Sequence, residues 1–206
     1  MHARIAVFEQ RDPEGLSELR RTVEARSADW MRETQAIAFY AVADASSGKG
    51  YGLTLFEDER TLRAAEPVFE KMAKDVPERL RGKRISVSTQ EVIAHEVHDG
   101  ANAVRISRLK GSPTTSDETF ASAVDNVASE LKTIDGWKGL IVSLDRMTGT
   151  STAFTLWESV SAMKSSDKVA DKMRRHFADE AKQQIVSVDS CEIVFGHDRA
   201  PRLVAG

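Results

Sequence analysis

Apolar residues alternate along several short segments of the chain and recur at helical spacing in the segments between them. Residues 3–8 alternate in this way, which predicts a strand. Asp12-Pro13 then supplies an N-cap and a first-turn proline, and apolar residues recur every three or four positions up to about residue 33, which predicts a helix. The same patterns predict strands over residues 35–43, 51–57 and 84–95, and a helical region over 58–81 that is interrupted at Pro67 and Pro77.

This order of elements begins again after a polar linker at His98-Asp99-Gly100. The second set of predicted strands covers residues 104–109, 137–144, 152–158 and 184–195, with helices over 120–131 and 159–182. Each half therefore has the order strand, helix, strand, strand, helix, strand. This is the βαββαβ order of a ferredoxin-like unit.

The two halves are also related in sequence. Thr54-Leu55-Phe56-Glu57 matches Thr155-Leu156-Trp157-Glu158 at an offset of 101 residues, and fourteen positions are identical at that offset. Composition alone would give about six identities. The hairpin glycines, Gly48 and Gly149, fall in register as well. The sequence therefore predicts an α+β protein of two tandem units, residues 1–98 and 99–206.

Each predicted unit is a four-stranded sheet with both helices on one face, so its other apolar face has to be covered. Leu55 and Leu156 occupy equivalent positions, as do Val87 and Val188. We therefore expect the two units to pack sheet to sheet as a pseudo-dimeric α+β barrel. The alternative is pairing with a second chain, and a homodimer in addition to the internal pseudo-dimer stays open.

The residues around the repeated motif carry a resemblance to a known family. Phe154-Thr155-Leu156-Trp157-Glu158-Ser159, followed by Met163, has its counterpart in Leu53-Thr54-Leu55-Phe56-Glu57-Asp58, followed by Leu62. A hairpin strand that ends in an aromatic-Glu pair and leads into a helix resembles the dimeric α+β barrel superfamily, in particular its antibiotic-biosynthesis-monooxygenase-like branch. The resemblance covers residues 3–96 and 102–196. It implies a ligand cavity between the sheet and the two helices.

The resemblance implies three kinds of activity. Some members oxidise quinol-like aromatic compounds with oxygen and no added cofactor, others bind and degrade haem, and many have no established activity. We therefore expect a small-molecule-binding protein or a cofactor-independent monooxygenase acting on an apolar or aromatic substrate. The alternatives are a haem-binding or haem-degrading protein and a non-catalytic protein for ligand binding or assembly.

The resemblance points to the second half of the chain for the site. His176 follows Trp157 by nineteen residues, a spacing similar to that of the proximal histidine in haem-degrading relatives. Those relatives carry a second tryptophan where this chain has Ser166, and an asparagine on the first strand where this chain has Ser107. The first-half counterpart of His176 is Asp75, so at most one half could bind haem.

Arg4 and Arg105 are equivalent arginines in the two predicted first strands. Each points to the face opposite the neighbouring isoleucine, where it could hold an anionic ligand or form an internal ion pair. We favour ion pairs with Glu91 and Glu192, because these acidic residues are repeated as well.

Two further aromatic residues are candidates for the site. Phe56 shares its strand position with Trp157 and is expected to face the cavity or to pack against the helices. Tyr40 could hydrogen-bond a ligand from the second strand, although Ile141 stands at the equivalent position of the other half.

Composition narrows the classes of partner. The net charge of −3 is spread along a chain with 30% charged residues and without long like-charged blocks, so nucleic acid is not expected as a partner. No apolar run approaches the roughly 18 residues that cross a bilayer. Cys191, the single cysteine, lies in an apolar run, and we expect a buried thiol in a cytoplasmic protein. No His, Cys, Asp and Glu spacing indicates a metal site.

Overall fold

The computed structural model describes residues 1–44, 46–112 and 116–203. Its strands are β1 (His2–Glu9), β2 (Ala38–Ala43), β3 (Gly50–Phe56), β4 (Lys83–Val97), β5 (Ala103–Gly111), β6 (Trp137–Asp145), β7 (Thr150–Trp157) and β8 (Gln183–Asp198). Its helices are α1 (Leu16–Thr34), which follows the 3-10 turn η1 (Pro13–Gly15), and α2 (Glu59–Asp75), α3 (Glu78–Arg81), α4 (Asp117–Leu131), α5 (Val160–Ser165) and α6 (Asp167–Glu180). The α+β class and the doubled βαββαβ order are confirmed. Residue 45 of the first predicted hairpin turn and residues 204–206 of the tail lie outside the described residues.

The hydrogen-bonded strand order is that of a closed barrel, β1-β3-β2-β8-β5-β7-β6-β4. The chain forms two compact units. Unit 1 contains Met1–Thr89 and Cys191–Ala200, and unit 2 contains Gln90–Ser190 and the C-terminal segment from Pro201. The long strands β4 and β8 each begin in one unit and end in the other. The division into compact units therefore falls within these two strands, whereas the division predicted from the sequence repeat falls after residue 98.

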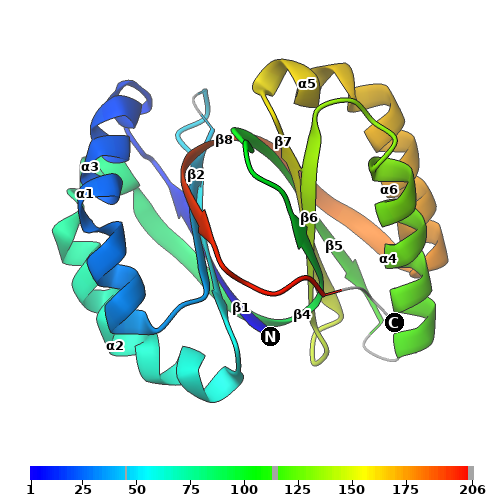
Figure 1. The fold of residues 1–206 in the computed structure, drawn as a ribbon, viewed down its shortest axis with the longest axis horizontal. Helices are drawn as coiled ribbons and strands as arrows, with labels where there is room; N and C mark the ends of the chain where they lie inside the picture. The colour runs from blue at the N-terminus through cyan, green and yellow to red at the C-terminus, as the bar shows by residue number, and fades with distance from the viewer. Residues whose placement is uncertain (45, 113–115, 204–206) are drawn as a thin grey trace. The chain divides into compact units, whose positions relative to one another are not determined.

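In unit 1, β3 pairs antiparallel with β1 on one side and with β2 on the other, and β2 pairs with the second part of β8. Helices α1 and α2 cover one face of this sheet (Figure 1). Asp58 caps the start of α2 by accepting a hydrogen bond from the Thr61 amide. The predicted interruption at Pro67 is wrong, because α2 continues through it to Asp75. Burial of its apolar face against the sheet offsets the lost backbone hydrogen bond.

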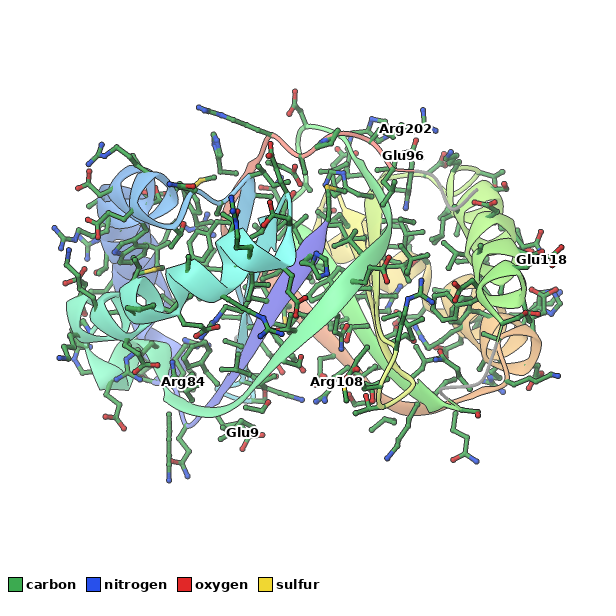
Figure 2. All side chains as sticks on the ribbon, turned by 90° about the horizontal axis from the view of Figure 1, so that it is seen from below. Glu9, Arg84, Glu96, Arg108, Glu118 and Arg202 are labelled. Atoms are coloured by element: carbon green, nitrogen blue, oxygen red, sulfur yellow. The ribbon has the colours of Figure 1, made fainter. Side chains whose placement is uncertain are left out.

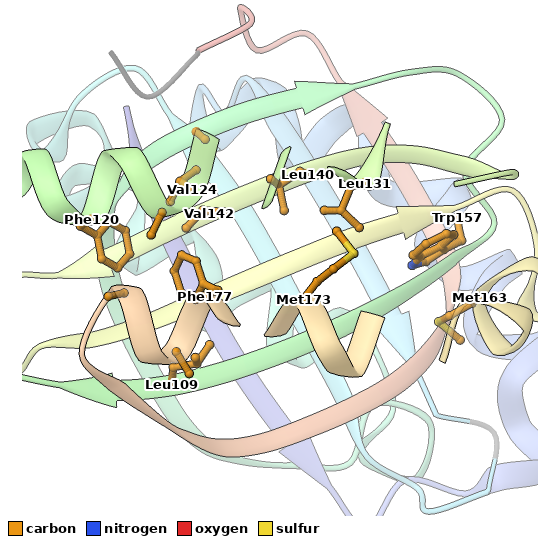
Figure 3. Close-up of a cluster of buried hydrophobic side chains, with 14 of the residues drawn as sticks. Leu109, Phe120, Val124, Leu131, Leu140, Val142, Trp157, Met163, Met173 and Phe177 are labelled. Atoms are coloured by element: carbon orange, nitrogen blue, oxygen red, sulfur yellow. The ribbon is translucent and has the colours of Figure 1, made fainter. Parts of the chain in front are cut away.

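In unit 2, β7 lies between β5 and β6, and β6 also pairs with the second part of β4. The face of this sheet that meets α4 and α6 holds one apolar core (Figure 3). Its members include Leu109, Phe120, Val124, Leu131, Leu140, Val142, Trp157, Met173 and Phe177. The predicted helical region 159–182 is divided at Ser166, where the hydroxyl donates to the Met163 carbonyl oxygen at 2.6 Å.

Both hairpin turns have the glycine that the sequence predicts. Gly48 and Gly149 each have a φ of +68°, a conformation that glycine adopts without steric cost. Gln35 also has a positive φ and ends α1, so β2 begins three residues later than the predicted strand. Cys191 is buried, as predicted. Among the described residues, no helix is long and apolar enough to span a membrane.

The C-terminal segment is anchored within unit 2. Leu203 forms an isolated bridge with His95, and the Arg202 guanidinium contacts the Glu96 carboxylate at 3.0 Å (Figure 2). Lys132 contacts the same carboxylate at 2.8 Å. These two cations lower the pKa of Glu96, even though burial, the largest single influence, acts to raise it.

Candidate functional site

Unit 1 contains a cavity of about 130 Å³ between its sheet and the helices α1 and α2. Most of its lining is apolar or aromatic, and its charged lining residues are all arginines. The lining consists of Arg4, Ala6, Phe8, Arg11, Leu19, Val23, Trp30, Phe39, Ala41, Val42, Ala43, Gly50, Tyr51, Gly52, Thr54, Phe69, Met72, Ala73, Val76, Arg81 and Arg84. For scale, an engineered apolar cavity of about 150 Å³ binds benzene.

The cavity exists because three small residues lie side by side across the sheet. Gly52 of β3 pairs with Ala6 of β1 and with Ala41 of β2. A Cβ atom added at Gly52 would have no heavy atom nearer than the Phe8 ring, at 3.9 Å. The row therefore forms a low floor, and the helices pack on the larger residues around it.

Aromatic side chains form much of the cavity wall. Trp30 of α1 packs edge-on against Phe39 of β2, with ring centroids 6.2 Å apart. The Trp30 indole donates to the Asp75 carboxylate at 3.2 Å, which holds the ring in place. Phe69 of α2 lies under the Arg4 guanidinium, whose central carbon is 3.9 Å from the ring centroid.

Three of the four lining arginines have a carboxylate within 4.0 Å of the guanidinium. Arg4 donates to both carboxylate oxygens of Glu66, at 2.8 and 3.1 Å, and Arg84 contacts Glu70 at 2.6 Å. Arg81 donates to main-chain carbonyl oxygens, the closest at 2.9 Å, and its guanidinium lies 4.0 Å from Glu78. Arg11 differs from these three and is described below.

The equivalent space in unit 2 is much smaller, about 50 Å³. Its floor row is Ser107, Ala153 and Val142, which are each larger than their counterparts in unit 1. On the helical side, Phe177 and Arg174 take the places of Val76 and Ala73. The side chains that fill this space are those of the unit 2 core (Figure 3).

Three of the seven residues proposed from the sequence line a cavity. Arg4 lines the cavity of unit 1, whereas Arg105 and Ser107 line the small space of unit 2. Ser107 accepts a hydrogen bond from Arg174 at 3.0 Å. Arg105 donates to the Met163 carbonyl oxygen at 2.6 Å and pairs with the Asp167 carboxylate.

The three aromatic candidates line neither of these two spaces, and each contacts other protein groups. Trp157 is fully buried, and its indole donates to the Thr155 hydroxyl at 3.3 Å. Phe56 is fully buried and packs edge-on against Phe69 of α2. Tyr40 donates to the Asp198 carboxylate at 2.5 Å, and burial raises the pKa of its hydroxyl far above the ordinary range.

The predicted pairing of the repeated arginines with Glu91 and Glu192 is wrong. Arg4 pairs with Glu66, as described above, and Arg105 pairs with Asp167. Glu66 and Asp167 are themselves equivalent at the offset of 101 residues, so the ion pair is duplicated with the sheet and helix that hold it. Glu91 instead contacts Arg146 at 2.6 Å. Glu66 and Asp167 are both acidic but are not identical residues. A comparison of the two halves by charge, and not only by residue identity, therefore identifies both as candidate partners of the arginines.

His176 lies on the outer side of α6. Its side chain is 57% exposed and lies 3.4 Å from the Glu180 carboxylate. It lines neither cavity, and neither cavity reaches the roughly 300 Å³ at which pockets for larger ligands begin. The residues present at this position therefore do not fit haem held by His176. In the part of the chain that the structure describes, no cluster of three or more His, Cys, Asp or Glu side chains could hold a metal ion.

Most residues that line the unit 1 cavity carry no signal for a site in the sequence. Trp30, Gly52 and Arg11 line this cavity and are not among the site residues that the sequence predicts. The signal for Gly52 was present, since a glycine in the middle of a strand often marks a close approach or an open space. No sequence pattern marks Arg11, because its position is defined by segments distant in the chain.

Fold and cavity together define a class of protein: an α+β barrel of two ferredoxin-like units in one chain, with a ligand-sized space between sheet and helices. The solved structures with this fold include an anthrone oxidase-like protein, with a TM-score of 0.63, 14% identity and coverage of 100% of this chain and 96% of that chain. A ferredoxin-fold protein related to antibiotic biosynthesis monooxygenases, from Listeria monocytogenes, has a TM-score of 0.51 and 8% identity over 93% of this chain and 94% of that chain. A haem-degrading enzyme from Listeria monocytogenes has a TM-score of 0.52 and 6% identity over 93% of this chain and 99% of that chain.

These similarities confirm the predicted fold. No protein-family model and no curated protein matches the chain.

Proposed function

We propose that this chain binds a small, largely apolar or aromatic molecule in the unit 1 cavity, between the sheet and the helices α1 and α2. The observation that carries the proposal is the apolar space of about 130 Å³ above the floor formed by Ala6, Gly52 and Ala41. A close-packed interior has few voids larger than a water molecule, and unit 2 closes most of the equivalent space with larger side chains. A ring-sized ligand gains favourable dispersion contacts with the aromatic walls on entering.

The lining side chains are suited to binding and orienting a ligand. Trp30 and Phe39 offer ring edges and faces, and Thr54 offers a hydroxyl group. In such a cavity, oxygen transfer would depend on an electron-rich substrate that itself activates oxygen, while the protein would supply a dry and shaped environment. Cofactor-independent oxidation of a quinol-like substrate is therefore the second candidate function, and the names of the structural neighbours favour testing it.

Intrinsic fluorescence would test binding, because Trp30 lines the cavity whereas Trp137 belongs to unit 2. A panel of single-ring quinols and phenols is titrated into the protein, and a bound ring is expected to change the emission of Trp30. Trp30→Phe should abolish the change and Trp137→Phe should preserve it. A signal that instead depends on Trp137, or no signal across the panel, would count against the cavity of unit 1.

Oxygen consumption with the same panel separates a binding protein from an oxidase. Oxygen uptake that the wild-type protein shows and the cavity-filling variant Gly52→Val lacks supports catalysis in unit 1. Binding without oxygen uptake supports the non-catalytic function.

A further inference from the structure

Arg11 is a buried cation that lines the cavity, and no carboxylate among the described residues forms an ion pair with it. Its side chain lines the unit 1 cavity and the residue is only 3% exposed. Its two terminal nitrogens donate to the main-chain carbonyl oxygens of Asp12 and Asp44, both at 2.7 Å. Its Nε is buried and has no hydrogen-bond partner among the described residues.

Three carboxylates act on this guanidinium, those of Asp12, Asp44 and Glu192, and none of them is bonded to it directly. The Asp12 side chain accepts from the Glu14 amide at 3.0 Å, and the Asp44 side chain accepts from the Ser46 amide and hydroxyl. Among the described residues, Arg11 forms no ion pair with a carboxylate, in contrast to Arg4 and Arg84. A buried donor left without a partner costs free energy, and a buried charge costs more.

The position of Arg11 is built by the backbone around it. Its amide donates to the Gly48 carbonyl oxygen at 3.0 Å. Gly48 and Gly82 both have positive φ angles, and a Cβ at Gly48 would come within 2.6 Å of the Arg11 carbonyl oxygen. Two loops therefore pack closely on this residue and hold it at the rim of the cavity. Burial lowers the pKa of Arg11, and the nearby Asp12, Asp44, Cys191 and Glu192 offset this only in part.

We infer that the ligand of the unit 1 cavity is a small aromatic carboxylic acid whose carboxylate binds the Arg11 guanidinium while its ring occupies the space above Gly52. This inference rests on the proposed function and adds the charge of the ligand to it. A carboxylate is favoured over a phenolate because carboxylic acids titrate near pH 4 and phenols near pH 10, so only the former is ionised at neutral pH without help. Guanidinium groups also match carboxylates in geometry.

The test compares benzoate with its neutral isostere benzamide by isothermal titration calorimetry, with phenol as a third probe. Benzoate is expected to bind about 10- to 100-fold more tightly than benzamide, the range expected for a hydrogen bond to a charged group. Arg11→Met should abolish this preference and leave the weaker binding of benzamide in place. The control is Arg84→Met, which removes a lining arginine that already has a carboxylate partner and should keep the preference.

The outcomes separate the two proposals. Equal affinity of the wild-type protein for benzoate and benzamide, or tighter binding of phenol than of benzoate, overturns the carboxylate inference and leaves the cavity proposal standing. No binding of any of the three probes overturns both. The comparison of benzoate with benzamide on the wild-type protein is by itself enough to overturn the carboxylate inference. The inference can therefore be tested even if Arg11→Met fails to fold.

Discussion

Gly52→Val is expected to stabilise the protein and to abolish ligand binding at the same time. Gly52 lies in the middle of β3 with its Cα facing the cavity, and the nearest obstacle to a new Cβ is the Phe8 ring at 3.9 Å. The two valine methyl groups would enter space that the wild-type protein leaves empty. Valine also favours the extended backbone that glycine weakens.

The magnitude follows from two contributions. Full burial of a valine side chain is worth about 1.5 to 3 kcal/mol, and replacing a strand glycine adds roughly 0.5 to 1 kcal/mol. Contacts with the surrounding rings will not be ideal, so we expect a net gain of about 1 to 2 kcal/mol, in line with other cavity-filling substitutions. At about 2 to 4 °C per kcal/mol for a chain of this size, the midpoint of thermal unfolding should rise by roughly 2 to 8 °C.

The assay is thermal unfolding followed by circular dichroism, with and without a ligand from the fluorescence panel. The matched control is Ala153→Val, the equivalent position in unit 2, where the space is about 50 Å³. That substitution should leave ligand binding unchanged and should raise the midpoint less, or lower it. If Gly52→Val lowers the midpoint, the cavity is not the open space described here, and if the variant binds the ligand as before, the ligand lies elsewhere.

Three further predictions concern Glu66, His176 and Glu96. Glu66→Gln should lower the free energy of unfolding by about 1.5 to 3 kcal/mol, because it leaves the buried Arg4 without its carboxylate. Urea unfolding measures this difference, and an unchanged transition would show that the ion pair contributes nothing to stability. His176→Ala should leave the absorbance of haem mixed with the protein unchanged, since His176 is an exposed residue that lines neither cavity; loss of a Soret shift in the variant would refute this. Because the folded-state pKa of Glu96 is lowered, its contribution to stability is present above the unfolded value, near pH 4.3, and is lost as the pH falls through the folded value. Glu96→Gln should therefore flatten the acid side of the stability profile, and an unaltered acid slope would contradict the assignment.

The sequence alone determined the repeated order of elements and the fold class. Periodicity distinguishes strands from helices within each half, and the repeat shows that the order occurs twice. The helix boundaries were less predictable. Pro67 was expected to interrupt α2, and only the packing of that helix on its sheet shows why it does not.

The sequence also showed that Arg4 and Arg105 are special positions, but not what they contact. Strand alternation determines the face to which a side chain points, and it says nothing about which helix residue stands opposite. Glu66 and Asp167 lie about sixty residues further along the chain, and only the packing of helix on sheet brings them to the arginines.

The tertiary structure is needed to tell which half has the larger space between its sheet and helices. A cavity is a difference between the volume enclosed by the elements and the volume of the side chains that fill it, so it depends on residues from three strands and two helices at once. Ala6, Ala41 and Gly52 lie in three separate strands, and they form a floor because the register places them in one row. The same holds for Arg11, whose unpaired donor arises from loops that meet only in the folded chain.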